Sequence, residues 1–384
     1  MKLRIWMIAV SLLIAVTLLP GCAGSPQTQM IIIPDAEESQ HADEPTGPFK
    51  VEKIYRIPLA AKGGLLGWFG TDSLLGVYNG TNGSQILEEI KPPYADLQKV
   101  RALGAKQYVF DLSPDGKRIT AIEEKGSHYE LQLLSLTGEA DLKLKTIDTS
   151  ELTTKQFTWS DNSRYLAFTN YVSEPEVTGQ SEIVVYDMQN RTSEIYKIPF
   201  LKEGQTELYN SVHVSDDGNN AFLLVQRIDE TRLVAGKLKD GEFVAQYEHA
   251  LSRYGQAAWL NDNQVAFLSQ DGTLYAYDLR NEAVAVLLDY ALTFELSRDR
   301  HTIAYSKEDG TLLAGRVQGN NIINASPIYQ GVLPYQMSWS EDNRRLLIFG
   351  GRSLIRSSQG PAVVPSAEYS VQESDWLPFI IELK

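Results

Sequence analysis

Cysteine is nearly absent from this chain, which has one, Cys22, in 384 residues. A single thiol excludes an intramolecular disulfide, so an exported domain of this sequence would depend on its core alone. Histidine is scarce too, and its five copies are scattered rather than spaced as zinc ligands. The histidines are His41, His128, His213, His249 and His301.

Familiar catalytic motifs are also missing. Neither Gly-x-Ser-x-Gly, typical of α/β-hydrolases, nor the His-Glu-x-x-His of zinc peptidases occurs. We therefore expect no cofactor, no metal and no catalytic residue of these kinds. A catalytic carboxylate pair could be hidden among 49 acidic residues, so an acid-based activity stays open.

Basic residues are outnumbered. The chain has 35 Lys and Arg against 49 Asp and Glu, a formal net charge of −14. Binding to nucleic acid requires a basic surface, and the same holds for flat adhesion to anionic lipid. The charge argues against both and is suited to keeping an exported protein soluble and monomeric.

A long hydrophobic run is missing as well. The apolar stretch at 5–19 is shorter than the roughly 20 residues of a membrane span, but it fits the core of a secretory signal behind Lys2 and Arg4. It ends in Leu19-Pro20-Gly21-Cys22, which resembles the lipobox of bacterial lipoproteins. That resemblance implies cleavage between Gly21 and Cys22 and a diacylglyceryl group on the Cys22 thiol. We thus predict a signal peptide at 1–21.

The segment that follows is polar, acidic and rich in proline. Residues 22–49 include Asp35-Ala-Glu-Glu and Asp43-Glu-Pro-Thr-Gly-Pro. Such a composition cannot bury enough apolar surface to fold, so we predict a disordered tether between a lipidated Cys22 and a domain at 50–384.

One short phrase is present seven times in that domain. In its clearest copy, an apolar strand ends at Trp159 and a Ser-Asp-Asn-Ser turn leads into the strand Tyr165-Leu-Ala-Phe168. Consecutive copies lie 37 to 55 residues apart, and four of the six tryptophans occupy the aligned position. The aligned residues are Trp68, Leu112, Trp159, Val214, Trp259, Leu296 and Trp339. A strand-based period of this length predicts a β-propeller.

Each repeat has material for four antiparallel strands. The Ser-x-Asp turn joins the first two, a third often ends in an aromatic-Asp pair such as Tyr186-Asp187, and a more polar fourth follows. Seven phrases favour seven blades, with six as the alternative if one phrase only closes the ring. Two segments could close it, 51–58 at the start and 376–381 at the end, because an open edge strand invites aggregation.

The phrase Ser113-Pro-Asp-Gly-Lys-Arg118 with a later Tyr-Asp strand resembles the TolB-like propeller repeat, which is WD40-like in outline. With the lipobox ahead of it, and Gly67-Trp-x-x-x-Asp-x-Leu-Leu75 as its first phrase, the chain resembles the YqgU-like propeller lipoproteins of Gram-positive bacteria. The resemblance spans about 50–384. It implies a lipid-anchored propeller on the outer face of the cytoplasmic membrane, with six blades in place of our seven phrases.

Two insertions interrupt the spacing, at 171–182 and 201–210. Propeller connectivity puts both on one face, where enlarged loops commonly recognise partners. Tolerated length variation is an equal alternative. If the insertions recognise a partner, the candidate contacts are Tyr171, Glu174, Glu176 and Tyr209.

The expected function is a non-catalytic platform that binds a protein or an envelope polymer. Two alternatives stay open: an envelope enzyme that acts on carbohydrate through acidic residues at the channel rim, and a small-molecule or ion sensor in the channel.

Overall fold

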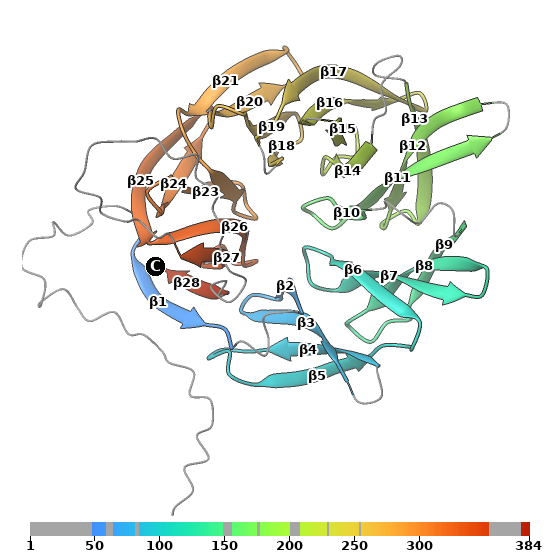
Figure 1. Cartoon of the computed structure of the whole chain (residues 1–384), viewed down its shortest axis with the longest axis horizontal. Coiled ribbons are helices and arrows are strands. Elements are labelled where there is room, and N and C mark those ends of the chain that lie inside the picture. The colour runs from blue at the N-terminus through green and yellow to red at the C-terminus, as the bar shows by residue number, and fades with distance from the viewer. Residues whose placement is uncertain are drawn as a thin grey trace, which may run out of the picture.

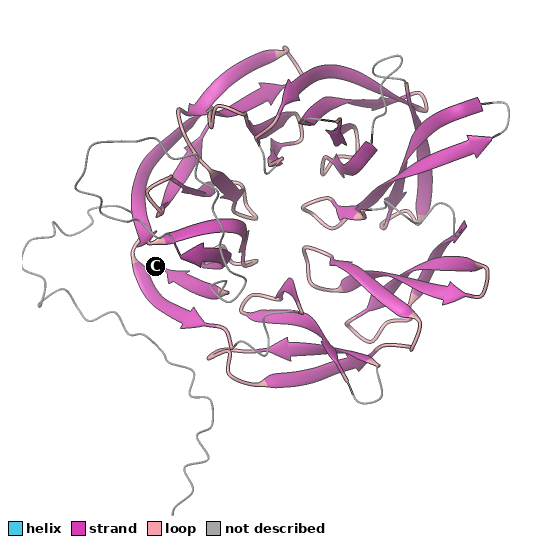
Figure 2. Cartoon of the chain, viewed as in Figure 1, coloured by secondary structure: helices cyan, strands magenta, loops and turns pink. Residues whose placement is uncertain are grey.

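The structure is a computed structural model, and it describes residues 48–58, 64–80, 84–148, 156–174, 177–199, 208–228, 230–252, 255–352 and 378–384. Over these ranges every named element is a strand, and the strands surround a central axis as a ring of blades (Figures 1 and 2). The described ranges hold no helix of the length and apolarity that a bilayer span requires. The predicted signal peptide and most of the predicted tether lie outside the described residues.

Seven four-stranded antiparallel units make up the ring. Five are separate sheets, and two are joined into one eight-stranded sheet by a single parallel bridge between Lys197 and Glu242. From inside to outside, blade 1 contains β2 Leu65–Phe69, β3 Ser73–Asn79, β4 Gln85–Ile90 and β5 Leu97–Ala102. Blade 2 contains β6 Gln107–Leu112, β7 Arg118–Lys125, β8 His128–Ser135 and β9 Leu142–Asp148. Blade 3 contains β10 Thr158–Trp159, β11 Tyr165–Glu174, β12 Val177–Asp187 and β13 Thr192–Ile198.

The remaining blades follow the same order. Blade 4 contains β14 Leu208–Val214, β15 Asn220–Gln226, β16 Thr231–Lys239 and β17 Glu242–Ala250. Blade 5 contains β18 Ala257–Asn261, β19 Gln264–Leu268, β20 Leu274–Asp278 and β21 Ala283–Leu288. Blade 6 contains β22 Thr293–Leu296, β23 Thr302–Ser306, β24 Thr311–Gln318 and β25 Asn321–Gln330. Blade 7 contains β26 Val332–Trp339, β27 Arg345–Arg352, β28 Phe379–Leu383 and, as its outermost strand, β1 Val51–Arg56.

The hydrophobic core is divided among the seven boundaries between blades. Each of seven clusters of buried side chains joins two consecutive blades, and the seventh joins blade 7 to blade 1. The seven aligned residues of the repeat are all buried in these clusters or beside them, from Trp339 at 1% exposed to Leu296 at 9%. The seven phrases thus mark seven blades among the described residues, and the six-bladed alternative is wrong for this chain.

The two ends of the propeller meet in blade 7. Strand β1 pairs antiparallel with β28, with Ile54 opposite Ile381 and Tyr55 opposite Ile380. The Tyr55 hydroxyl also donates to the Glu382 carboxylate at 2.9 Å. Both segments proposed from the sequence therefore take part in closure, which leaves the first and last blades paired rather than open.

The turns after the inner strands lie on one face of the ring, called here the turn face. The opposite face, where the inner strands begin, is called the connector face. The first insertion continues β11 and β12 toward the connector face, with pairing as far as Glu174 opposite Val177. It is thus a β-hairpin extension where the sequence suggested an enlarged loop, and Figure 1 shows it reaching past the outline of the ring.

Candidate functional site in the central channel

In each inner strand, the residue that directly precedes the buried aligned residue points to the opposite side, because side chains alternate along a strand. Across the seven blades this position holds Gly67, Asp111, Thr158, His213, Ala258, Glu295 and Ser338. Five of the seven residues line a single cavity, so the channel wall is polar and differs from blade to blade.

The turns that follow the inner strands are held by their serine side chains. The Ser113 hydroxyl donates to the Asp115 carboxylate at 2.7 Å and accepts a hydrogen bond from the Arg118 backbone N–H at 2.9 Å. The same Ser-to-Asp hydrogen bond is made by Ser215, Ser297 and Ser340. These contacts bear out the turn interpretation of the Ser-x-Asp phrase.

Neighbouring turns are also linked to one another. The Asp115 backbone N–H donates to Ser163 Oγ at 2.8 Å, and the Asn162 backbone N–H donates to Asp216 at 2.8 Å. The Arg298 backbone N–H donates to the Asn343 side chain at 2.7 Å. The turns are therefore fixed relative to each other across several blade boundaries.

Arg300 spans the channel at the turn face. Its guanidinium, in the turn of blade 6, donates to Asp161 in blade 3 at 2.8 Å and to Asp216 in blade 4 at 2.6 Å. These blades are not neighbours of blade 6, so the ion pairs cross the axis. The Arg300 side chain is 15% exposed.

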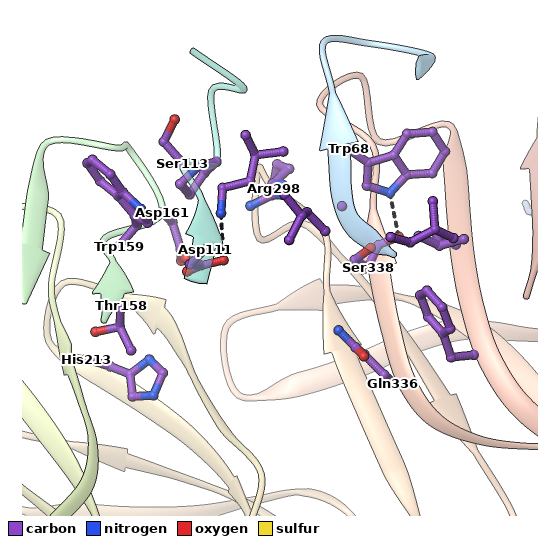
Figure 3. A pocket seen from close by; sticks show the side chains of 17 residues that line it. Trp68, Asp111, Ser113, Thr158, Trp159, Asp161, His213, Arg298, Gln336 and Ser338 are labelled. Atoms are coloured by element: carbon purple, nitrogen blue, oxygen red, sulfur yellow. Dashed lines mark hydrogen bonds between the residues drawn. The ribbon is translucent and has the colours of Figure 1, made fainter. Parts of the chain in front are cut away.

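A cavity of about 230 Å³ lies between the inner strands, and Figure 3 shows the side chains that surround it. Its polar lining includes Asp111, Thr158, Asp161, His213, Arg298, Gln336 and Ser338. Its apolar lining includes Leu65, Leu66, Trp68, Trp159, Leu347 and Phe349. The turn residues Asp161 and Arg298 place it at the turn-face end of the channel.

Two carboxyl groups of the channel wall have raised pKa values. Burial raises the pKa of Glu295 to about 8, against the opposing effect of the nearby Arg298 cation. Burial likewise raises the pKa of Asp111 to about 6, although the Leu112 backbone N–H at 2.9 Å and Arg298 stabilise its charged form. At neutral pH the first group is mostly protonated and the second mostly ionised.

His213 differs from these two acids in that its uncharged form is the one present at neutral pH. Burial lowers its pKa to about 4, and the charge of Asp161 only partly offsets this, so the ring is neutral at physiological pH. Its Nε2 is 3.0 Å from Ser211 Oγ, and the imidazole stacks on Phe222 with ring centroids 4.6 Å apart. The structure thus places this histidine in the channel wall, where it can donate or accept one further hydrogen bond.

The residues that the sequence singled out lie elsewhere. Cys22, Gly21 and Glu176 are outside the described residues. Tyr171 and Glu174 are placed only by their backbone, on the β11 extension. Tyr209 is half-buried and packs against the core between blades 3 and 4. The adjoining Leu208 is the exposed residue, at 52%.

The residues that line the channel were not predicted from the sequence, although the repeat pattern could have identified them. Once Trp159 and its equivalents are aligned as buried, strand alternation assigns the preceding residue to the channel. The Arg300 bridge carries no such signal, because its three members are remote in sequence.

No family model and no curated protein matches this sequence. Among solved structures, the chain resembles an oligogalacturonate lyase in complex with manganese, with a TM-score of 0.55 and 10% identity over 90% of this chain and 95% of that one. A prolyl endopeptidase gives a TM-score of 0.50 and 12% identity over 74% of this chain and 45% of that one.

The chain also matches part of a much longer tricorn protease, covering 67% of itself but only 29% of that chain, with a TM-score of 0.41 and 14% identity. At such identities the likeness to solved structures shows the fold alone. The chain is a β-propeller similar in fold to these proteins.

Proposed function

We propose that this chain is a lipid-anchored propeller on the outer face of the cytoplasmic membrane, where it acts as a non-catalytic platform that binds a protein or an envelope polymer. The observation that supports this best is the β11–β12 extension of blade 3. Strand β11 has 10 residues and β12 has 11, whereas the corresponding strands of blade 5 have 5 each. An extended hairpin on a rigid ring offers contact surface at little conformational cost.

The sequence of the hairpin suits recognition. Tyr171 offers a large contact area with few rotatable bonds, and Glu174 and Glu176 offer charge. Most of the second insertion, at 201–207, lies outside the described residues. Tyr209 is a weaker candidate than the sequence implied, because it already packs against the core.

A shortened hairpin tests the platform directly. In one variant residues 172–180 are deleted and Tyr171 is joined to Ser181, its cross-strand partner, through an Asn-Gly turn. The matched control is Asp240→Asn in the β16–β17 turn, where Asp240 and Gly241 already have positive φ values of 54° and 77°. Both variants should fold as the wild type does.

The readout is capture of partners from detergent-solubilised membranes and from cell-wall fragments. We expect the control to capture the same material as the wild type and the shortened variant to lose it. Equal capture by all three proteins would contradict a role for the hairpin. Cleavage of cell-wall oligosaccharides by the purified wild type would favour an enzyme instead.

The anchor has a separate test. Metabolic labelling with a lipid precursor should mark the wild type and not Cys22→Ser, because the thioether needs the thiol. Equal labelling of both proteins would contradict lipidation at Cys22.

A further inference from the structure

The cavity in the channel contains polar groups that nothing in the fold requires. Within the described residues, no hydrogen bond or ion pair joins the side chains of Arg298, Gln336 or Ser338 to another side chain. Gln336 is exposed, and Arg298 and Ser338 are partly exposed, so their hydrogen-bonding groups are available to a bound molecule.

The charges around the cavity leave no excess of positive charge. Arg300 is one cation shared by two carboxylates, Asp161 and Asp216. Arg298 acts electrostatically on Asp111, which is mostly ionised at neutral pH. His213 is uncharged there, and Glu295 is mostly protonated. An anionic ligand would therefore find no excess cation, whereas hydroxyl groups would find both donors and acceptors.

The volume of the cavity and the residues that line it restrict the class of ligand further. A volume of about 230 Å³ is smaller than the range of about 300–1,000 Å³ common for drug-sized ligands and equals roughly eight waters at about 30 Å³ each. The rings of Trp68, Trp159 and Phe349 line it together with the polar groups. Aromatic surfaces mixed with several donors and acceptors suit the apolar and hydroxylated faces of a sugar ring.

We propose that this cavity binds an uncharged, polyhydroxylated molecule of about monosaccharide size. Gln336 and Ser338 bond its hydroxyl groups, and Arg298 and Asp111 bond it as a charge-balanced pair. The site is distinct from the hairpin of blade 3 and does not depend on the platform function.

Saturation-transfer NMR on the purified full-length protein tests this site. The probes are glucose, galactose and N-acetylglucosamine up to about 20 mM, a range that reveals dissociation constants near 1 mM. Glucuronate serves as the anionic comparator. We expect saturable binding of at least one neutral sugar and weaker binding of glucuronate.

Three variants locate the binding. Gln336→Ala removes a hydrogen-bonding group from the cavity and should weaken binding at least tenfold. Ser338→Leu fills the cavity and should abolish binding. Gln98→Ala, at an exposed site on β5, should leave binding unchanged. Thermal melting of each variant checks the fold. If Ser338→Leu does not fold, the binding measured with Gln336→Ala still decides the proposal.

The proposal is overturned if no neutral sugar binds, if glucuronate binds more tightly, or if Gln336→Ala binds as the wild type does. The sugar-binding test and the hairpin deletion are independent, so a negative result in one does not change the interpretation of the other.

Discussion

Glu295 shows how one residue of the channel couples the fold to pH. Burial shifts its pKa from 4.5 to about 8. Between these values the unfolded chain releases a proton that the folded protein keeps, so the free energy of unfolding falls as the pH rises. The buried Glu295 carboxyl therefore lowers the free energy of unfolding above about pH 5. Its presence is better explained by function than by packing.

The variant Glu295→Gln tests that assignment. It cannot titrate, so its advantage over the wild type should be near zero at about pH 4.5 and grow to roughly 1–2 kcal/mol at about pH 8, discounted for water in the channel. Urea unfolding of both proteins across this range measures the difference. A difference that does not change with pH would show that Glu295 titrates normally.

Residues that face the channel were the part of the site that sequence reasoning could have found but did not. The repeat drew attention to Trp159 and its equivalents because they are alike, while the preceding residue differs in every blade. The exposure of Tyr209 could not be inferred, because it depends on contacts with the neighbouring blade.

At the scale of elements, the inner strand and its turn form the unit that the sequence predicts best. One short motif predicts the buried residue, the Ser-to-Asp turn and the second strand, because these three features are adjacent in the sequence. The β11–β12 extension was harder to predict, because a tip rich in Glu, Pro and Gly favours a loop. Continued backbone pairing keeps the chain in strands there.

The tryptophans of the inner strands allow a matched comparison between two blades. Trp68→Phe removes the 2.9 Å hydrogen bond to the Ser338 carbonyl, whereas Trp159→Phe removes a donor that has no partner. We expect the first variant to lose about 1 kcal/mol more stability than the second in urea unfolding. Replacement by Ala should cost about 3–5 kcal/mol at either site, because both side chains are buried.

Equal losses for Trp68→Phe and Trp159→Phe would contradict the difference in hydrogen bonding. Alanine variants that unfold as the wild type does would contradict the burial of the repeat position.

At the scale of the whole molecule, the Arg300 bridge joins blades that do not touch. Arg300→Gln leaves Asp161 and Asp216 without their shared cation, and burial already raises the pKa of Asp216. We expect a loss of about 1–2 kcal/mol in urea unfolding, partly recovered when Asp216→Asn is added.

Arg280→Gln is the matched control for the bridge. Its side chain is 61% exposed and pairs with Asp278 within one blade, so its loss should cost less than about 1 kcal/mol. If the two arginine variants lose the same small amount, the bridge across the channel does not form in solution.

The ring as a whole could be predicted from its period, and its closing segments from their lack of a hairpin partner. The number of blades needed the structure, because one phrase could equally have served as a closing element. Strand β1 settles this by adding the fourth strand to blade 7. The same strand follows the predicted tether, so the closing contact is also the one nearest the proposed membrane anchor.

Closure of seven blades by the N-terminal strand is the central claim, and a designed disulfide tests it most directly. In a Cys22→Ser background, Ile54→Cys and Ile381→Cys place two thiols opposite each other in the β1–β28 pair and in one core cluster. Ile54→Cys with Ile380→Cys is the control, because a shift of one residue turns the second thiol to the other side of the sheet. The account predicts that mild oxidation links residues 54 and 381 in the folded protein, with a higher melting temperature, and leaves the control unlinked. No link in the first protein, or equal links in both, would contradict the closed ring.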